Sequence, residues 1–196
     1  MNKSLVDRIP TDLAVSSVHP DYLEACIEAC CTGLRYPSKL EPGTVTLLRR
    51  TTAGQAGRKY GVVGIWWFTG ISEHLRPGQF RWPRRWAYRV KFSPLVHRFE
   101  SPFCEMFTEP MPDHYATLRS SSKVPGLIYT SLQGSLVRVH DKTIAAKYVH
   151  ALLEEKAEEL TQEATYLGQT VRVDALLKAF AKKLESQAKS LVTAQA

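Results

Sequence analysis

The pattern of hydrophobic and polar positions predicts short strands over the first two thirds of the chain and helices at its end. Segments rich in β-branched and aromatic side chains are separated by Gly, Pro and Ser clusters, which is typical of strands joined by turns. Strands are expected at residues 12–18, 60–68, 86–92, 127–129 and 136–139. Residues 40–48 are expected to hold a Pro42-Gly43 turn that leads into a further strand. The proline-broken stretch at 93–123 predicts extended pieces and turns.

In two of the expected strands, the hydrophobic pattern also predicts which side chains are buried. Residues 60–68 are apolar almost throughout, so this strand is expected to be buried on most of both faces. Gly61 and Gly64 within it predict a bulge or a close approach of another backbone segment. Residues 86–92 instead alternate, which predicts Trp86, Tyr88, Val90 and Phe92 facing inward and Ala87, Arg89 and Lys91 facing outward.

Helices are expected in three places. Pro20 suits a first helical position and Gly33 a helix end, so the first helix is expected from residue 20 to about 32. Its three cysteines, Cys26, Cys30 and Cys31, are interpreted as small core residues. An apolar stripe of helical spacing begins after Asp141, and a second amphipathic helix is expected over residues 173–191.

Because helices do not alternate with the strands, a doubly wound parallel sheet is not expected. The predicted fold class is α+β, a small mixed β-barrel with helices packed outside and C-terminal helices. Residues 1–160 are expected to form the barrel domain and residues 161–196 a C-terminal helical extension. This last part could pack on the barrel or on another chain.

Composition narrows the class of protein. With 196 residues and 44% hydrophobic content the chain can bury a sizeable core, so wholesale disorder is excluded. No apolar run is long enough to span a membrane, and the amino terminus lacks the apolar stretch of a signal peptide. Four cysteines without a disulfide framework favour a reducing compartment, so a soluble cytoplasmic protein is expected.

The charge is unevenly spread along the chain. The net charge is +7, yet residues 34–98 hold 13 Lys or Arg side chains and only two acids, Glu41 and Glu73. This segment of net charge +11 lies between mildly acidic ends. If the charges served solubility alone, positive and negative side chains would be interspersed, because that arrangement causes less self-repulsion. The uneven distribution therefore favours a surface that binds a polyanion.

Motifs for catalysis or for cofactors are absent from the sequence. The glycines match no phosphate-binding loop, and no histidine lies near the cysteines at metal-ligand spacing. The histidines are scattered, so no nucleophile and base are recognisable. No cofactor, metal or catalytic residue is therefore assigned. If the protein were an enzyme, the first suspects would be Lys59, Tyr60, Asp113 and His114.

Aromatic residues interleaved with arginine are the strongest chemical signal. All four tryptophans, Trp66, Trp67, Trp82 and Trp86, fall within about twenty residues that also hold several arginines. Aromatic faces stack on bases and guanidinium groups neutralise phosphates, so the combination favours nucleic-acid binding. Trp66 and Trp67 are neighbours on a strand and should point to opposite sides. Trp82, between Arg81 and Pro83, is expected to be exposed or at a pocket rim.

Several segments together resemble the PUA-like superfamily, in particular its EVE and YTH-related branch. These are the first strand ending in Ser16 and Ser17, the Pro42-Gly43 turn before a strand, the strand with Val63-Gly64-Ile65, the alternating residues 88–92, and residues 132–136 before a terminal helix. The resemblance implies a small mixed barrel that binds RNA or DNA. It also implies that an unpaired, often modified base sits in a pocket with aromatic walls.

Carried over by position, the resemblance and the aromatic signal define a candidate site. The base-pocket candidates are Ser17, Tyr36, Trp66, Trp67 and Trp82. The phosphate-binding candidates are Arg49, Arg50, Arg58, Lys59, Arg81, Arg84 and Arg85. The resulting hypothesis is a non-enzymatic protein that holds a base, methylated for example, while its basic surface contacts the phosphate backbone.

Two other functions remain open at this point. The related ASCH branch of PUA-like proteins resembles hydrolases in some members, so an enzyme acting on nucleic acid or a small amide is one alternative. The other is a protein-interaction module, or self-association, through the C-terminal helices.

Overall fold

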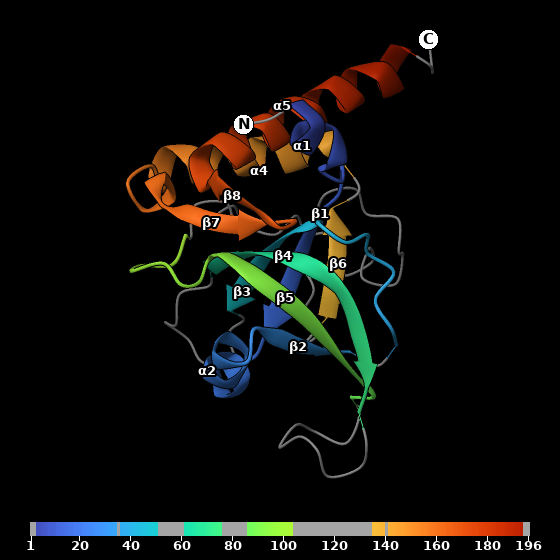
Figure 1. The fold of residues 1–196 in the computed structure, drawn as a ribbon, viewed down its shortest axis with the longest axis vertical. Helices are drawn as coiled ribbons and strands as arrows, with labels where there is room; N and C mark the ends of the chain where they lie inside the picture. The colour runs from blue at the N-terminus through green and yellow to red at the C-terminus, as the bar shows by residue number, and fades with distance from the viewer. Residues whose placement is uncertain are drawn as a thin grey trace, which may run out of the picture.

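A six-stranded mixed sheet curls into a half-barrel at the centre of the molecule (Figure 1). The computed structural model describes residues 3–34, 36–50, 61–75, 86–103, 135–139 and 141–193. The strands are β1 (Leu13–Val18), β2 (Cys31–Leu34), β3 (Val45–Arg50), β4 (Gly61–His74), β5 (Tyr88–Val96) and β6 (Ser135–Val139). Their order across the sheet is β2-β5-β4-β3-β1-β6, in which only β1 and β3 are a parallel pair.

Irregularities in β4 bend the sheet. Its pairing shifts register opposite Leu48 and Arg49 of β3, and again where residues 69–71 bulge against β5. Gly70 in this bulge has a φ of +89°, a conformation that glycine adopts without strain. Bulges increase local twist and bend, and the two edge strands β2 and β6 consequently come into contact.

The inner face of the curl is filled by one hydrophobic cluster, closed by helix α2 (Pro20–Glu28). This inner cluster consists of Val18, Leu23, Cys26, Ile27, Leu48, Val63, Trp66, Phe68, Val90 and Phe92. Leu34 of β2 and Leu136 of β6 also pack against it, so both edges of the sheet share this core. Figure 1 shows α2 on the opposite side of the sheet from the other helices.

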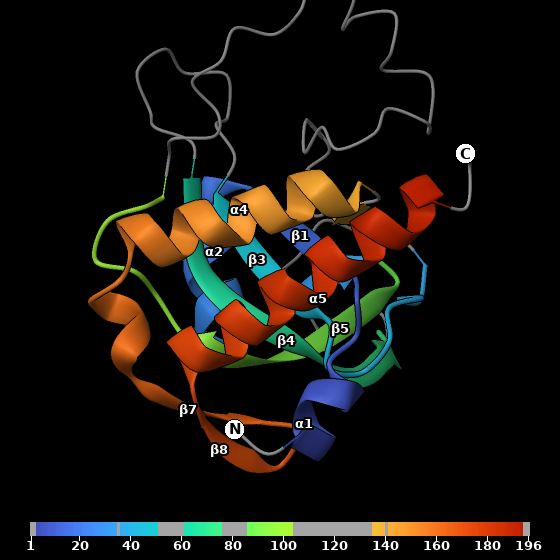
Figure 2. The ribbon, with the colours of Figure 1, turned by 90° about the horizontal axis from the view of Figure 1, so that it is seen from above.

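The outer face is covered by a layer of helices and a small hairpin (Figures 1 and 2). These elements are α1 (Lys3–Arg8), α4 (Lys142–Glu155), the 3-10 turn η2 (Glu159–Thr161), β7 (Glu163–Tyr166), β8 (Gln169–Arg172) and α5 (Val173–Thr193). Asp141 begins α4 by accepting hydrogen bonds from the amides of Thr143 and Ile144 at 2.8 and 3.0 Å.

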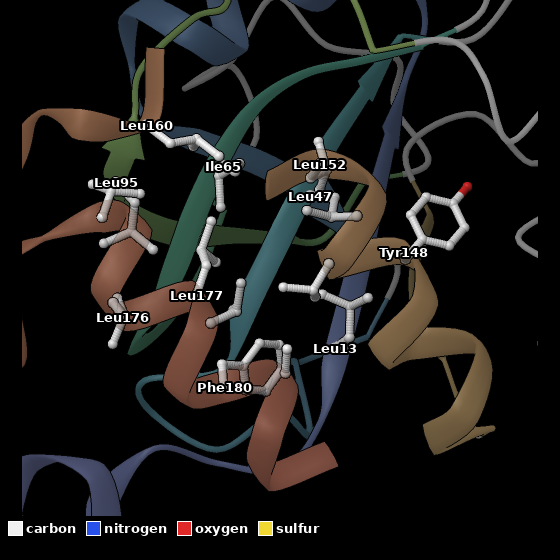
Figure 3. Close-up of a cluster of buried hydrophobic side chains, with 14 of the residues drawn as sticks. Leu13, Leu47, Ile65, Leu95, Tyr148, Leu152, Leu160, Leu176, Leu177 and Phe180 are labelled. Atoms are coloured by element: carbon white, nitrogen blue, oxygen red, sulfur yellow. The ribbon is translucent and has the colours of Figure 1, made fainter. Parts of the chain in front are cut away.

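The C-terminal elements share one outer cluster of buried side chains with the sheet. Leu13, Leu47 and Ile65 of three adjacent strands belong to the same cluster as Leu177 and Phe180 of α5 (Figure 3). Of the two placements expected for the last helix, the structure therefore shows packing on the barrel.

Most of the expected elements are found, and the mixed α+β class with C-terminal helices is confirmed. Within β5, Val90 and Phe92 are buried while Arg89 and Lys91 are partly exposed, as the alternation predicts. Trp86 and Tyr88, which were also expected to face inward, are only partly buried, because Trp86 precedes β5 and Tyr88 is its first residue. Gly64 makes the expected close approach, since a Cβ there would lie 2.8 Å from the carbonyl oxygen of His97. The expected strand at 127–129 lies outside the described residues.

The predicted helix over residues 20–32 is wrong at its end. It stops at Glu28, because Cys30 takes a left-handed φ of +44° and the chain then pairs with β5 as strand β2. Cys31 therefore belongs to a strand opposite Lys91 rather than to the helix. Strand pairing overrides the helical spacing of the apolar residues here. The expected burial of Cys26 and Cys31 is confirmed, whereas Cys30 is only partly buried.

Candidate functional site

The strand register separates the candidate residues into two ends of the sheet. Ser17 on β1 pairs with Arg49 on β3, which pairs with Val62 near the start of β4. Leu34 at the end of β2 pairs instead with Tyr88, which pairs with His74 at the end of β4. Almost the whole length of the fourteen-residue strand β4 thus lies between the two groups. The group around Ser17 is called the serine end, and the group around Leu34, His74 and Tyr88 the hairpin end.

Tyr36 belongs to the hairpin end. The amide of Ala87 donates to the carbonyl of Leu34 at 3.0 Å, and the amide of Ser38 donates to Ser72 Oγ on β4 at 3.4 Å. These two contacts hold the segment that carries Tyr36 beside the end of the β4–β5 hairpin. The Tyr36 residue is 67% exposed, so a flat aromatic surface faces solvent there.

A pair of aromatic rings, those of His74 and Tyr88, lies at the same end. The rings of His74 and Tyr88 are 5.1 Å apart and nearly perpendicular, as cross-strand neighbours at the last pairing of β4 with β5. The amide of Leu75 donates to the carbonyl of Ala87 at 2.7 Å and closes the stem of the hairpin. The segment that joins the two strands carries Arg81, Trp82, Arg84 and Arg85 in its sequence, and these four candidates lie outside the described residues.

Charged side chains line the outward face of this hairpin. Glu73 on β4 lies between two cations of β5. Its Oε2 accepts a hydrogen bond from Arg89 Nε at 3.0 Å, and its Oε1 lies 2.6 Å from Lys91 Nζ. The ammonium of Lys91 and the guanidinium of Arg89 hold the pKa of the Glu73 carboxyl below its usual range. All three side chains remain more than a third exposed, so the cluster is accessible from solvent.

The serine end is polar and buried. Ser17 is fully buried and Arg49 is 4% exposed, while Arg50 at the end of β3 is half-buried. The hydroxyl groups of Ser16 and Ser17 have no hydrogen-bond partner within the part of the chain that the structure describes. The other two phosphate-binding candidates of this region, Arg58 and Lys59, lie outside that part, in the segment between Arg50 and Gly61.

Trp66 and Trp67 face opposite sides of the sheet, as expected for neighbours on a strand. Trp66 is fully buried in the inner cluster, and its Nε1 points to the carbonyl of His97 at 3.4 Å. Trp67 lies against the outer cluster, where its Nε1 donates to the carbonyl of Thr165 at 2.9 Å and its ring meets the edge of Tyr166. Both indoles therefore hold layers of the protein together in this structure.

The structure does not bring the four described base-pocket candidates into one group, and the fifth, Trp82, lies outside the described residues. Ser17 lies at one end of the sheet and Tyr36 at the other, and the two indoles of β4 lie on opposite faces between them. Tyr36 is the described candidate with an exposed ring. The suspects for catalysis, Lys59, Tyr60, Asp113 and His114, all fall outside the described residues.

Sequence reasoning did not select Glu73, Arg89 and Lys91 as site residues. The alternation of residues 86–92 already assigned Arg89 and Lys91 to the outward face, so that signal was available. Their common partner Glu73 becomes visible only through the pairing of β4 with β5.

No cluster of three or more His, Cys, Asp and Glu side chains suited to a metal ion occurs among the residues placed by the structure. None of the helices in the described ranges is long and apolar enough to cross a membrane. No protein-family model matches the chain, and the comparison with curated proteins gives no match either.

Proposed function

We propose that the protein binds single-stranded nucleic acid at the hairpin end and catalyses no reaction there. The observation that carries this proposal is the exposed ring of Tyr36 beside the stem of the β4–β5 hairpin. A base that stacks on an exposed aromatic ring contributes roughly 1–3 kcal/mol of binding free energy. Stacking needs an unpaired base, and therefore a single strand, a loop or an extruded nucleotide is the expected ligand.

The charge around Tyr36 supports a phosphate backbone as the rest of the ligand. The sequence that joins β4 to β5 adds Arg76, Arg81, Arg84 and Arg85 without an acid, and Trp82 provides a second stacking candidate. Each phosphate that a cation neutralises releases condensed counterions, so the affinity should fall steeply as the salt concentration rises.

A finer part of the proposal concerns the family and the ligand. The curled six-stranded sheet with α2 against its inner face supports a place among PUA-like barrels of the EVE and YTH-related branch. A modified base, such as a methylated adenine or cytosine, is then the expected target. We also keep the cytoplasm as the proposed location, because the sequence favours a reducing compartment.

A fluorescence-anisotropy titration tests this proposal. Labelled single-stranded and double-stranded DNA and RNA of the same sequence, with and without a methylated base, are titrated with the full chain at two salt concentrations. The expected result is salt-sensitive binding that is strongest for one single-stranded ligand. A failure to bind every one of these ligands at low salt would refute the proposal.

Two variants of Tyr36 make the test specific to the hairpin end. Tyr36→Ala removes the stacking surface and should weaken binding roughly 5- to 150-fold, which corresponds to about 1–3 kcal/mol. Tyr36→Phe keeps the ring and should bind within about twofold of the wild type, since stacking uses the ring face. Equal affinities of Tyr36→Ala and the wild type would place the ligand elsewhere.

A further inference from the structure

Among the described residues, the ion-pair cluster at the hairpin end joins one carboxylate, that of Glu73, to two cations. Glu73 Oε1 lies 2.6 Å from Lys91 Nζ, and Glu73 Oε2 accepts from both Nε and Nη2 of Arg89. The formal charges of these three side chains sum to +1. Thr69 Oγ1 donates to the backbone carbonyl of Lys91 at 2.9 Å, which fixes the bulge of β4 against the strand that carries both cations.

The cluster is open to a ligand. The exposed fractions of the Glu73, Arg89 and Lys91 side chains are 38%, 35% and 38%. Ion pairs at such exposure contribute little to the stability of a fold, so the fold loses little if the cations exchange their partner. Figure 1 shows that β4 and β5 extend beyond the helical layer, which leaves this part of the hairpin uncovered by α4 and α5.

The arrangement has the chemistry of a phosphate site occupied by a carboxylate. A guanidinium fork presents parallel N–H groups that fit the two oxygens of a carboxylate or of a phosphate equally well. Lys91 adds a point charge on the other carboxylate oxygen. Arg89 also directly follows Tyr88 in the sequence. Tyr88 pairs with Leu34 at the end of β2, and the segment that carries Tyr36 comes directly after β2.

We propose that Arg89 and Lys91 bind a backbone phosphate of the nucleic acid, and that Glu73 holds both cations in the free protein until the phosphate displaces it. This inference rests on the function proposed above, and it adds the phosphate-binding pair and an internal competitor. Glu73 sets the affinity and restrains non-specific binding, because every phosphate has to replace a carboxylate that is already in place.

Glu73→Gln tests the inference because it removes the competing charge and leaves a side chain of the same size. The full chain and this variant are titrated with a fluorescein-labelled single-stranded oligonucleotide at several salt concentrations. Glu73→Gln should bind roughly two- to tenfold more tightly at low salt. Arg89→Gln and Lys91→Gln should each weaken binding and reduce the salt slope by about 0.7, the loss of one phosphate contact.

Glu24→Gln is the matched control for charge. Glu24 on α2 pairs with Arg98 at 2.7 Å, both side chains are exposed, and Arg98 follows β5 at the serine end. The control changes the net charge by the same amount, so it should alter the affinity by less than about 1.5-fold. Equal gains in Glu24→Gln and Glu73→Gln, or a loss of affinity in Glu73→Gln, would overturn the inference while the proposed function stands.

A measurement without nucleic acid tests the anion site separately from the proposed function. Inorganic pyrophosphate is titrated into the full chain, and the Nε–Hε resonance of Arg89 is followed by nuclear magnetic resonance. This resonance should shift in the wild type and shift at lower pyrophosphate concentration in Glu73→Gln. If it shifts but no oligonucleotide binds, the proposed function fails and the anion site stands. If it stays unmoved in both proteins, the anion site is refuted.

Discussion

Replacing Phe180 by alanine should destabilise the sheet and the helical layer together. Phe180 lies on α5, is fully buried, and belongs to the same cluster as Leu13 and Leu47 of the sheet (Figure 3). Truncating a buried phenylalanine to alanine removes its apolar contacts and leaves a cavity, which costs about 3–5 kcal/mol of unfolding free energy. With a urea slope of about 2 kcal/mol per molar, the unfolding midpoint should fall by about 1.5–2.5 M.

The assay follows urea unfolding by two signals. Tryptophan fluorescence, to which Trp66 and Trp67 contribute, reports on the sheet, and far-ultraviolet circular dichroism reports mainly on the helices. Because one cluster joins the two layers, both midpoints should move together in Phe180→Ala. Leu191→Ala on the same helix is the control: Leu191 is 55% exposed, so its removal should leave both midpoints nearly unchanged.

A different outcome would refute this account of the core. If Phe180→Ala lowered the helical signal early while the tryptophan transition kept its wild-type midpoint, α5 would be an independent unit. The shared outer cluster would then not couple the C-terminal helices to the sheet.

Three further predictions concern single positions. Gly64→Ala should lower the unfolding free energy by about 1–3 kcal/mol in urea titrations, because its Cβ would lie 2.8 Å from the carbonyl oxygen of His97; a wild-type midpoint would contradict the close approach. Asp141→Ala should cost about 1 kcal/mol in the same assay through the lost cap of α4, and an unchanged midpoint would count against that cap. Burial raises the pKa of the Cys31 thiol to about 11, so this thiol stays protonated at pH 8 in the folded protein. Iodoacetamide at pH 8 should therefore modify the more exposed Cys30 before Cys31, as mapped by peptide mass spectrometry, whereas equal rates at the two residues would disprove the burial of Cys31.

Local patterns in the sequence predicted much of the fold, because the residues that form each pattern also determine the local structure. The alternation of residues 86–92 follows directly from which side chains of β5 face the inner cluster, as Val90 and Phe92 do. Asp141 likewise acts locally, because it caps the helix that begins directly after it. Features of this kind depend on a few neighbouring residues and are therefore legible in one sequence.

The features that sequence did not predict depend on contacts between distant segments. Cys31 continues a helical pattern in sequence, and only its pairing with Lys91 makes it part of a strand. The β7–β8 hairpin was missed because its strands have four residues each and mostly polar side chains. Its turn at Leu167 and Gly168, both with positive φ, leaves Gly168 as a local signal in the sequence.

The candidate site shows the same limit. Ser17 and Tyr36 were grouped because the resemblance carries both positions over to one pocket, but the register of five paired strands sets them at opposite ends of the sheet. Glu73 could not be assigned to Arg89 from sequence, since the bulge at residues 69–71 decides which residues of β4 and β5 face each other.

Mapping the contact surface by nuclear magnetic resonance tests the central claim most directly. A single-stranded oligonucleotide is added to the ¹⁵N-labelled full chain, and the backbone amide resonances are followed. The account predicts that the amides of Tyr36, Glu73 and Arg89 shift, whereas those of Ser17 and Arg49 at the serine end stay in place. Shifts confined to Ser17 and Arg49, or no shifts at low salt, would contradict a nucleic-acid site at the hairpin end.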